Sequence, residues 1–161
     1  MEILDSGERY QFYDKEGNPL AVRDMQEGKG RLDLVPLDIA ADIMSGYDKA
    51  NVFYWMKEFT STGHHGTLLI IIDLFAQERG WDMPTLMLEY AIHLEQGCKK
   101  YGENNWQKGI NTRSFVNSSL RHYLKWLRGD TDEPHDRAFV WNLIACMWTC
   151  IHKPELNDYK K

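Results

Sequence analysis

Two short stretches of this sequence bring together charged, imidazole and aromatic side chains at the ends of helix-like segments. The first is Lys99–Trp106, which holds two lysines, two asparagines, a tyrosine and a tryptophan. The second begins with Arg121-His122 and continues through the acidic run 129–136, which contains a further histidine. Cations bind phosphate, carboxylates and imidazoles bind metal ions, and aromatic rings stack on bases. This mixture predicts a metal-assisted site for a phosphorylated aromatic ligand such as a nucleotide.

A basic strip on the predicted helix 111–129 is suited to phosphate oxygens. Arg121, Lys125 and Arg128 follow one another at helical spacing within an otherwise acidic protein. The forked guanidinium group of arginine can bind phosphate through two hydrogen bonds. We therefore expect Arg121 and Lys125, together with Lys99 from the first stretch, to neutralise the negative charge that builds on the phosphates during catalysis.

Acidic and imidazole side chains from three predicted helices provide candidate metal ligands. They are Glu95, His122, Glu133 and His135, which we expect to hold Mg²⁺ or Mn²⁺. Structural explanations stay open beside this one. Glu95 can form a helix ion pair with Lys99, and His122 can be a buried histidine beside a tryptophan. The neighbouring Asp132 is expected to cap the last helix.

Aromatic rings and amide groups close to these charges are expected to seat a base. Tyr101 or Trp106 can stack on the base, and the amides of Asn105 and Asn142 can bind its polar edge. For Trp106 the alternative is a hydrophobic plug, and for Asn142 it is a hydrogen bond that ties neighbouring helices together. The glycine-rich arm 28–31 lacks the spacing of a Walker loop but can bring two basic residues to the phosphates. The expected nucleotide contacts are therefore Lys29, Arg31, Lys100, Tyr101, Asn105, Trp106 and Asn142.

Composition limits the partners and the location. The chain has 161 residues, enough for one domain with a real core, and 43% of them are apolar. Its net charge of −5 argues against general binding to nucleic-acid backbones. The polar start of the sequence is unlike a secretory signal, and the apolar run Leu68–Ile72 is too brief to cross a bilayer. Three cysteines without metal or redox spacing complete the prediction of a cytoplasmic protein that binds no membrane.

Hydrophobic periodicity and turn residues predict mainly helical structure. Residues 10–13 and 20–22, separated by a Glu-Gly-Asn turn, indicate a small hairpin. Helices are predicted over residues 36–47, 50–59, 67–79, 82–101, 111–129 and 133–152, with Pro134 in the first turn of the last. Asp82 is the expected N-cap of the fourth of these helices, with Pro84 just inside it.

The apolar faces of these helices define the expected fold. The last helix is apolar on nearly every side over residues 138–151, which predicts a central, buried position. The helix 82–101 is expected to turn five residues toward the core, namely Leu86, Tyr90, Ala91, Leu94 and Cys98. We predict a mainly α protein: a compact helical bundle over residues 34–161, preceded by an irregular N-terminal arm over residues 1–33.

Several short motifs occur here in one order along the chain. They are Val22-Arg23-Asp24, Gly28–Pro36, Lys100-Tyr101-Gly102, Asn105–Gly109, Leu120-Arg121-His122, Trp126–Asp130 and Trp141-Asn142-Leu143. In this order they resemble a phage and prophage family, the dATP/dGTP diphosphohydrolase N-terminal domain. The resemblance spans residues 20–45 and 85–152, and the segment 48–81 is interpreted as an insertion relative to it.

The resemblance implies a phage-associated helical protein that is linked to all-α MazG-like nucleotide pyrophosphohydrolases. Those enzymes bind Mg²⁺ or Mn²⁺ through carboxylates and work as dimers or larger assemblies. It therefore implies metal-dependent hydrolysis of dATP or dGTP to monophosphate and pyrophosphate, by a homo-oligomer in the cytoplasm (the host cytoplasm if phage-encoded). Only Glu133 and Asp136 match the ligand spacing of those enzymes. The alternative is a non-catalytic phage module that sequesters a nucleotide signal.

Overall fold

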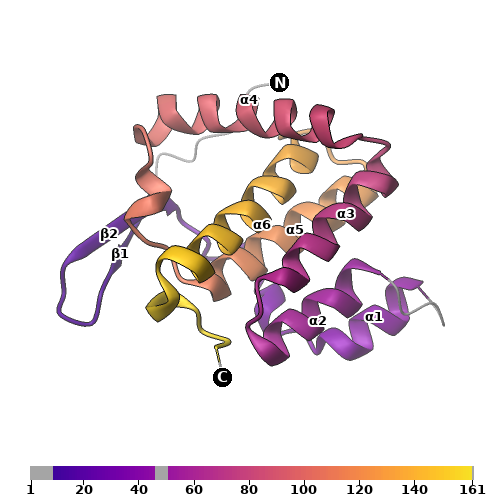
Figure 1. The fold of residues 1–161 in the computed structure, drawn as a ribbon, viewed down its shortest axis with the longest axis horizontal. Coiled ribbons are helices and arrows are strands. Elements are labelled where there is room, and N and C mark those ends of the chain that lie inside the picture. The colour runs from indigo at the N-terminus through magenta and orange to yellow at the C-terminus, as the bar shows by residue number, and fades with distance from the viewer. Residues whose placement is uncertain (1–8, 46–50, 161) are drawn as a thin grey trace.

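Helix α6 (His135–His152) lies at the centre of the fold, as its apolar sequence predicts (Figure 1). In this computed structural model, which describes residues 9–45 and 51–160, Phe139 and Leu143 of α6 are buried. Helices α5 (Thr112–Arg128) and α3 (Gly66–Arg79) pack against α6, and α4 (Met83–Tyr101) crosses one end of it. Six α-helices in the described residues confirm the predicted mainly α fold.

The remaining helices extend the bundle on one side. Helix α1 (Leu37–Ser45) packs on α2 (Val52–Thr62), and α2 packs on α3. The predicted end of the first helix at residues 46–47 lies outside the described residues. Single turns of 3₁₀ helix connect the longer elements, at Leu32–Leu34 (η1), Asn105–Lys108 (η2) and Pro154–Leu156 (η3). No helix within 9–45 and 51–160 has the length and apolar character needed to cross a bilayer.

Aromatic residues join α3, α5 and α6 into one core. The ring of Phe75 lies 4.6 Å from that of Phe139 and 5.0 Å from that of Trp126, in both cases edge to face. This geometry is the preferred one for aromatic pairs and adds to the stabilisation from burying the rings. These contacts fix the three helices relative to one another. They therefore also fix the positions from which the side chains of α5 and α6 project.

Helix ends follow the predicted caps except at α6. The Oδ1 atom of Asp82 accepts a hydrogen bond from the backbone N–H of Thr85 at 2.7 Å, which confirms the predicted cap of α4. The prediction that Asp132 caps the last helix is wrong, because α6 begins at His135 without a side-chain cap. Pro134 occupies the N-cap position, and Asp132 contacts the imidazole ring of His135 instead.

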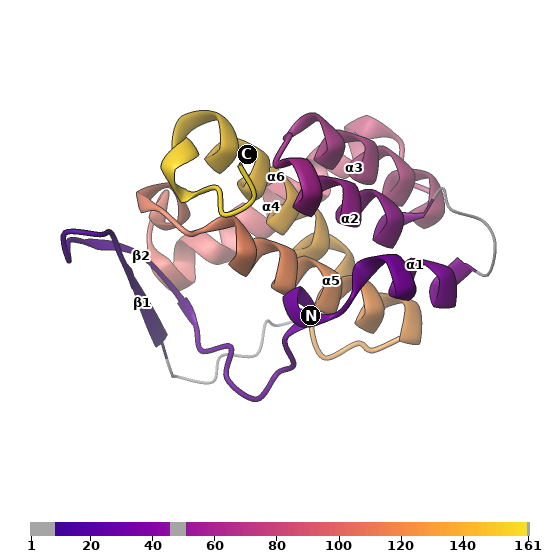
Figure 2. The same cartoon turned by 90° about the horizontal axis from the view of Figure 1, so that it is seen from below.

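The predicted hairpin is present, and several hydrogen bonds attach its second strand to the rest of the chain. Strands β1 (Arg9–Tyr13) and β2 (Pro19–Asp24) pair antiparallel and extend away from the bundle (Figure 2). The Asn105 side chain donates to the carbonyl of Val22 at 2.6 Å and accepts from the N–H of Val22 at 3.1 Å. This two-way clamp fixes the end of β2, and with it the direction taken by Arg23.

The prediction for the core face of α4 is wrong in part. Of its five expected core residues only Leu86 is buried, whereas Ala91 and Cys98 are exposed. Tyr90 and Leu94 border a cavity. The physical reason is that α4 crosses the end of the bundle instead of packing along it, so only its first turns reach the core. An apolar spacing identifies one face of a helix but not what that face meets.

Gly63, which ends α2, offers a test of this packing. Its φ of 71° is left-handed, and an added Cβ would lie 2.6 Å from the carbonyl oxygen of Tyr159. We expect Gly63→Ala to lower the free energy of unfolding by about 1–2 kcal/mol for the backbone and by a further 1–3 kcal/mol or so for the overlap. Gly80→Ala is the control, because Gly80 has a φ of 80° but open space around it. Urea unfolding measures the free energy of unfolding of both variants. Equal losses of stability in the two variants would contradict the close contact at Gly63.

Candidate functional site

A cavity of about 1220 Å³ lies between α4, α5, α6 and the segment after β2. Most of the predicted site residues line it: Lys29, Glu95, Lys100, Tyr101, Asn105, Trp106, Arg121, His122, Lys125, Glu133 and Asn142. His135 is buried directly behind His122. Lys99 and Arg31 lie outside the lining. Residues that are separated by more than a hundred positions in the sequence therefore converge on one hollow.

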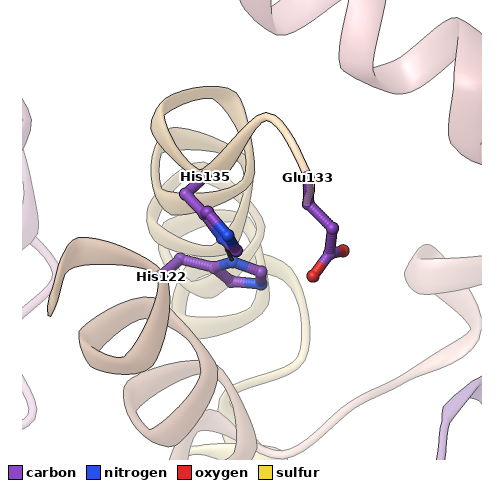
Figure 3. A group of neighbouring side chains, drawn as sticks. All are labelled: His122, Glu133 and His135. Carbon is purple, nitrogen blue, oxygen red and sulfur yellow. Dashed lines mark hydrogen bonds between the residues drawn. The ribbon is translucent and has the colours of Figure 1, made fainter. Parts of the chain in front are cut away.

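Two histidines and a glutamate form a compact group at the wall of this cavity (Figure 3). The Nδ1 atoms of His122 on α5 and His135 on α6 are 2.8 Å apart, so one ring donates its hydrogen to the other. Glu133, in the loop before α6, turns its carboxylate toward the pair, and the ligand atoms of all three residues lie within 4.8 Å of one another. Glu95, the fourth predicted metal ligand, is exposed and stands 4.0 Å from Lys99.

Asp132 orients the His135 ring. Its Oδ1 atom lies 2.6 Å from Nε2 of His135, and this hydrogen bond lowers the pKa of the Asp132 carboxyl group. Because the ionised carboxylate can only accept, we assign the hydrogen of His135 to Nε2 and leave the lone pair of Nδ1 facing His122. Metal-binding histidines are commonly oriented by a carboxylate in the same way.

Burial also controls the charge of His122. Removal of the ring from water, followed by the effect of nearby His135 and Arg121, holds the pKa of His122 well below 6.5. The ring is therefore neutral at neutral pH. A neutral imidazole is the form that can offer a lone pair to a metal ion.

Two arginines reach the same cavity without a carboxylate partner. Arg121 is only 7% exposed and donates to the side chains of Gln26 and Ser118. Arg23 donates to Oδ1 of Asn142 at 3.4 Å. Burial, and then the charge of Arg121, lower the pKa of Arg23 to about 10. Within the described residues no acidic group forms an ion pair with either guanidinium group.

Lys29 adds a third cation beside the two arginines. The residue as a whole is exposed, but partial burial of its ammonium group and next Arg121 lower its pKa, and no described residue forms an ion pair with it. Like charges that are partly removed from water are unfavourable unless an anion offsets them. The arrangement therefore suits a ligand that carries several negative charges close together, such as a chain of phosphates.

Two predicted nucleotide contacts at the end of α4 are used within the protein. The Lys100 ammonium group and the Tyr101 hydroxyl both donate to Asp24, each at 2.8 Å. Burial, and then this hydrogen bond, raise the pKa of Tyr101 well above its usual value. Asp24 thus ties the end of α4 to β2 and closes one side of the cavity.

The far side of the cavity is aromatic. Trp106 packs edge to face on Trp148, with ring centroids 5.1 Å apart, and on Trp141 at 6.3 Å. Trp106 therefore packs among neighbouring rings, as expected for a hydrophobic plug, and also lines the cavity; its stacking on a base stays a prediction. Asn142 lies between this aromatic wall and the cations, where it accepts from Arg23. Both hydrogen-bonding atoms of Asn105 are taken by the backbone of β2.

Arg23, Gln26 and His93 line the cavity although no sequence pattern singled them out as site residues. Arg23 and Gln26 belong to the N-terminal segment, and no local spacing shows that this segment meets α5. His93 had a signal, since it shares a polar line on α4 with Lys100. In the described structure its buried Nδ1 atom has no hydrogen-bond partner.

Three charged groups are directed elsewhere. Arg31 pairs with Asp33 at 2.7 Å, and Lys99 is exposed to solvent. Asp136 accepts from Arg79 at 3.0 Å and is not a member of the histidine group. The spacing of Glu133 and Asp136 therefore does not produce a two-carboxylate site of the kind that the sequence resemblance implies.

Comparison with known proteins gives one result. Residues 60–159 match the family model described as dATP/dGTP diphosphohydrolase, N-terminal, over more than half of the chain. The match includes α4, α5 and α6 and therefore His122, Glu133 and His135, while Arg23 and Lys29 precede it. No curated protein and no solved structure matches this chain significantly.

The buried His93 predicts a loss of stability in acid. Burial lowers the pKa of His93 from 6.5 to about 4. The unfolded chain therefore binds a proton that the folded chain does not, and this contribution to stability falls as the pH drops from about 6.5 to 4. His93→Gln should flatten the dependence of unfolding free energy on pH in that window by on the order of 2 kcal/mol.

Urea unfolding at a series of pH values measures this effect. His64→Gln is the matched control, since His64 is exposed on the loop before α3, and it should leave the profile unchanged. An unaltered profile in His93→Gln would show that His93 is not the buried neutral group described above.

Proposed function

The chain belongs to the dATP/dGTP diphosphohydrolase N-terminal family, and from that premise we propose that it hydrolyses purine deoxynucleoside triphosphates with the help of a divalent metal ion. In the proposed reaction water adds to the α-phosphorus and pyrophosphate leaves, so that a nucleoside monophosphate remains. The family name supplies the substrate class. The cavity holds residues that would support this reaction.

One observation carries the proposal: the buried Arg121 and the half-buried Arg23 reach one cavity without an ion-pair partner among the described residues. A triphosphate brings several negative charges and offers oxygens that match the forked geometry of guanidinium groups. Lys29 and Lys125 line the same cavity and would share that charge. As charge moves onto the pyrophosphate that leaves, fixed cations of this kind stabilise the transition state more than the bound substrate.

The shape of the cavity supports one orientation of the nucleotide. Along α6 the lining runs from Ala138, near the charged groups, to Trp148 at the aromatic wall. These residues are ten positions apart, which is about 15 Å of helix at 1.5 Å per residue. We place the phosphates at the end with Arg121 and the base against Trp106 and its neighbours, where ring faces suit a purine.

His122, Glu133 and His135 would hold the metal ion. The donors fit this role because both rings are held neutral or oriented by neighbours, and the described chain places them beside the cations that would bind phosphate. When bound, a divalent cation supplies a polarised phosphate oxygen and a water of lowered pKa. Roles for Lys99, Arg31 and Glu95 stay predictions, as does a homo-oligomer.

A module that binds nucleotide without turnover is the competing function. One finding favours it: the described chain offers a single carboxylate, Glu133, to the three-residue donor group at the cavity wall. Such a module would use the cations and the aromatic wall alone. It would bind a deoxynucleoside triphosphate and release no pyrophosphate.

Arg121→Gln tests the proposal at the residue on which it depends most. Loss of this buried cation should weaken binding of dGTP or dATP at least tenfold, since a buried charged hydrogen bond is worth about 2 kcal/mol or more. Calorimetric titration measures binding, and a pyrophosphate assay with each deoxynucleotide and Mn²⁺, Co²⁺ or Mg²⁺ measures turnover.

Arg113→Gln is the matched control. Arg113 lies on the same helix, is exposed and pairs with Asp33 away from the cavity, so its loss should change neither measurement. Saturable binding without pyrophosphate would support the non-catalytic module. Unchanged affinity in Arg121→Gln would contradict both functions.

A further inference from the structure

The histidine and glutamate group has a donor chemistry that differs from the oxygen-only ligands expected for Mg²⁺. His122 and His135 contribute imidazole nitrogens, and Glu133 contributes one carboxylate. Magnesium is bound through carboxylates, phosphates and water in octahedral geometry, and calcium takes six to eight oxygens. Imidazole nitrogens instead favour first-row transition metals, and two histidines with one carboxylate are a common ligand set for zinc and iron.

We propose that His122, Glu133 and His135 form a site for a first-row transition-metal dication such as Zn²⁺ or Co²⁺ that discriminates against Mg²⁺ and Ca²⁺. This inference deepens the proposed function and rests on it for the purpose of the bound ion. The binding of the ion itself does not require nucleotide and can be measured without it.

The position of the neighbouring groups supports a site that is already assembled. The Nδ1 atoms of His122 and His135 face each other at 2.8 Å and share one hydrogen. A dication would take the place of that hydrogen between the rings, and His122 would then carry its hydrogen on Nε2. No proton has to be gained or lost by the pair in this exchange. The ring of His135 needs no movement, because Asp132 holds it from the other side at 2.6 Å.

Three protein ligands leave positions open on a bound ion, and the location of the group shows where those positions would face. His122 and Glu133 belong to the lining of the cavity, whereas His135 is buried behind them. Catalytic zinc sites have this arrangement of three protein ligands and an accessible position, while structural sites are closed by four. The open positions would face the cations Arg121 and Lys125, where phosphate oxygens are expected.

A second acidic arrangement around His135 is less suited to an ion. Asp130 and Asp132 also approach this residue. However, Arg128 donates to Asp130 at 2.8 Å, and Asp132 already accepts from Nε2 of His135. An ion there would have to break both interactions. The group that faces the cavity requires neither change.

Titration with Co²⁺ in the absence of nucleotide tests the proposal directly, because cobalt reports its ligands through visible absorption. We expect one Co²⁺ per chain, displacement by Zn²⁺, and no displacement by a large excess of Mg²⁺. These measurements use the unaltered chain and therefore do not depend on the folding of any variant. Displacement of Co²⁺ by Mg²⁺ would overturn the proposal.

Three variants locate the site. His122→Gln and His135→Gln should abolish the cobalt spectrum, and Asp132→Asn should weaken binding roughly 10–100-fold by releasing the orientation of His135. The control is the double variant His64→Gln/His65→Gln, which removes the adjacent exposed histidines and should leave binding intact. A spectrum that survives in both single histidine variants, or disappears in the double variant, would overturn the assignment.

The outcome is separable from that of the proposed function. Cobalt binding with the expected pattern but without pyrophosphate release would contradict the hydrolase and leave the metal site established. Pyrophosphate release that depends on Mg²⁺ and persists in His135→Gln would contradict the metal site and leave the hydrolase standing.

Discussion

The charge of two arginines at the cavity, one buried and one half-buried, is the constraint on which the proposed site depends. Arg23 and Arg121 are far apart in the sequence, on β2 and α5, and no acidic group within the described residues forms an ion pair with either. Neutral side chains hold them instead, namely those of Gln26, Ser114, Ser118 and Asn142. Hydrogen bonds to neutral acceptors orient a guanidinium group but do not cancel its charge. The two guanidinium groups therefore reach the cavity without an ion-pair partner, although carboxylates such as Glu133 also line it. An anionic ligand between the arginines would offset their charge.

Several local contacts hold these arginines in place. Asn105 fastens β2 to the helices through both hydrogen-bonding atoms of its side chain. Asp24, the next residue after Arg23, binds Lys100 and Tyr101 at the end of α4. The edge-to-face contact of Phe75 with Phe139 fixes α3 against α6. A rigid frame of this kind positions the cations on one wall and the imidazole pair on the next, so that a single ligand can meet both.

The sequence predicts the elements better than it predicts what those elements meet. Asp82 and the apolar helix around Phe139 carry local signals, a cap and an all-round apolar surface, and both predictions are confirmed. The approach of His122 to His135 could be predicted, because His122 lies in the second half of α5, His135 begins α6 and only a short loop separates the two helices. The positions of Arg23 and the exposed Cys98 could not be predicted in this way. Their surroundings depend on how the hairpin and the crossing helix α4 pack against the other helices. Asp132 shows a third case, in which a proline displaced the helix start and freed a capping residue to orient a histidine.

A crystal structure of the chain with a non-hydrolysable dGTP analogue and Co²⁺ tests the central claim most directly. The account predicts phosphate oxygens on Arg23 and Arg121, the base against Trp106, and anomalous scattering from cobalt between His122, Glu133 and His135. An analogue that binds elsewhere on the chain, or that leaves both guanidinium groups without a phosphate contact, would contradict it.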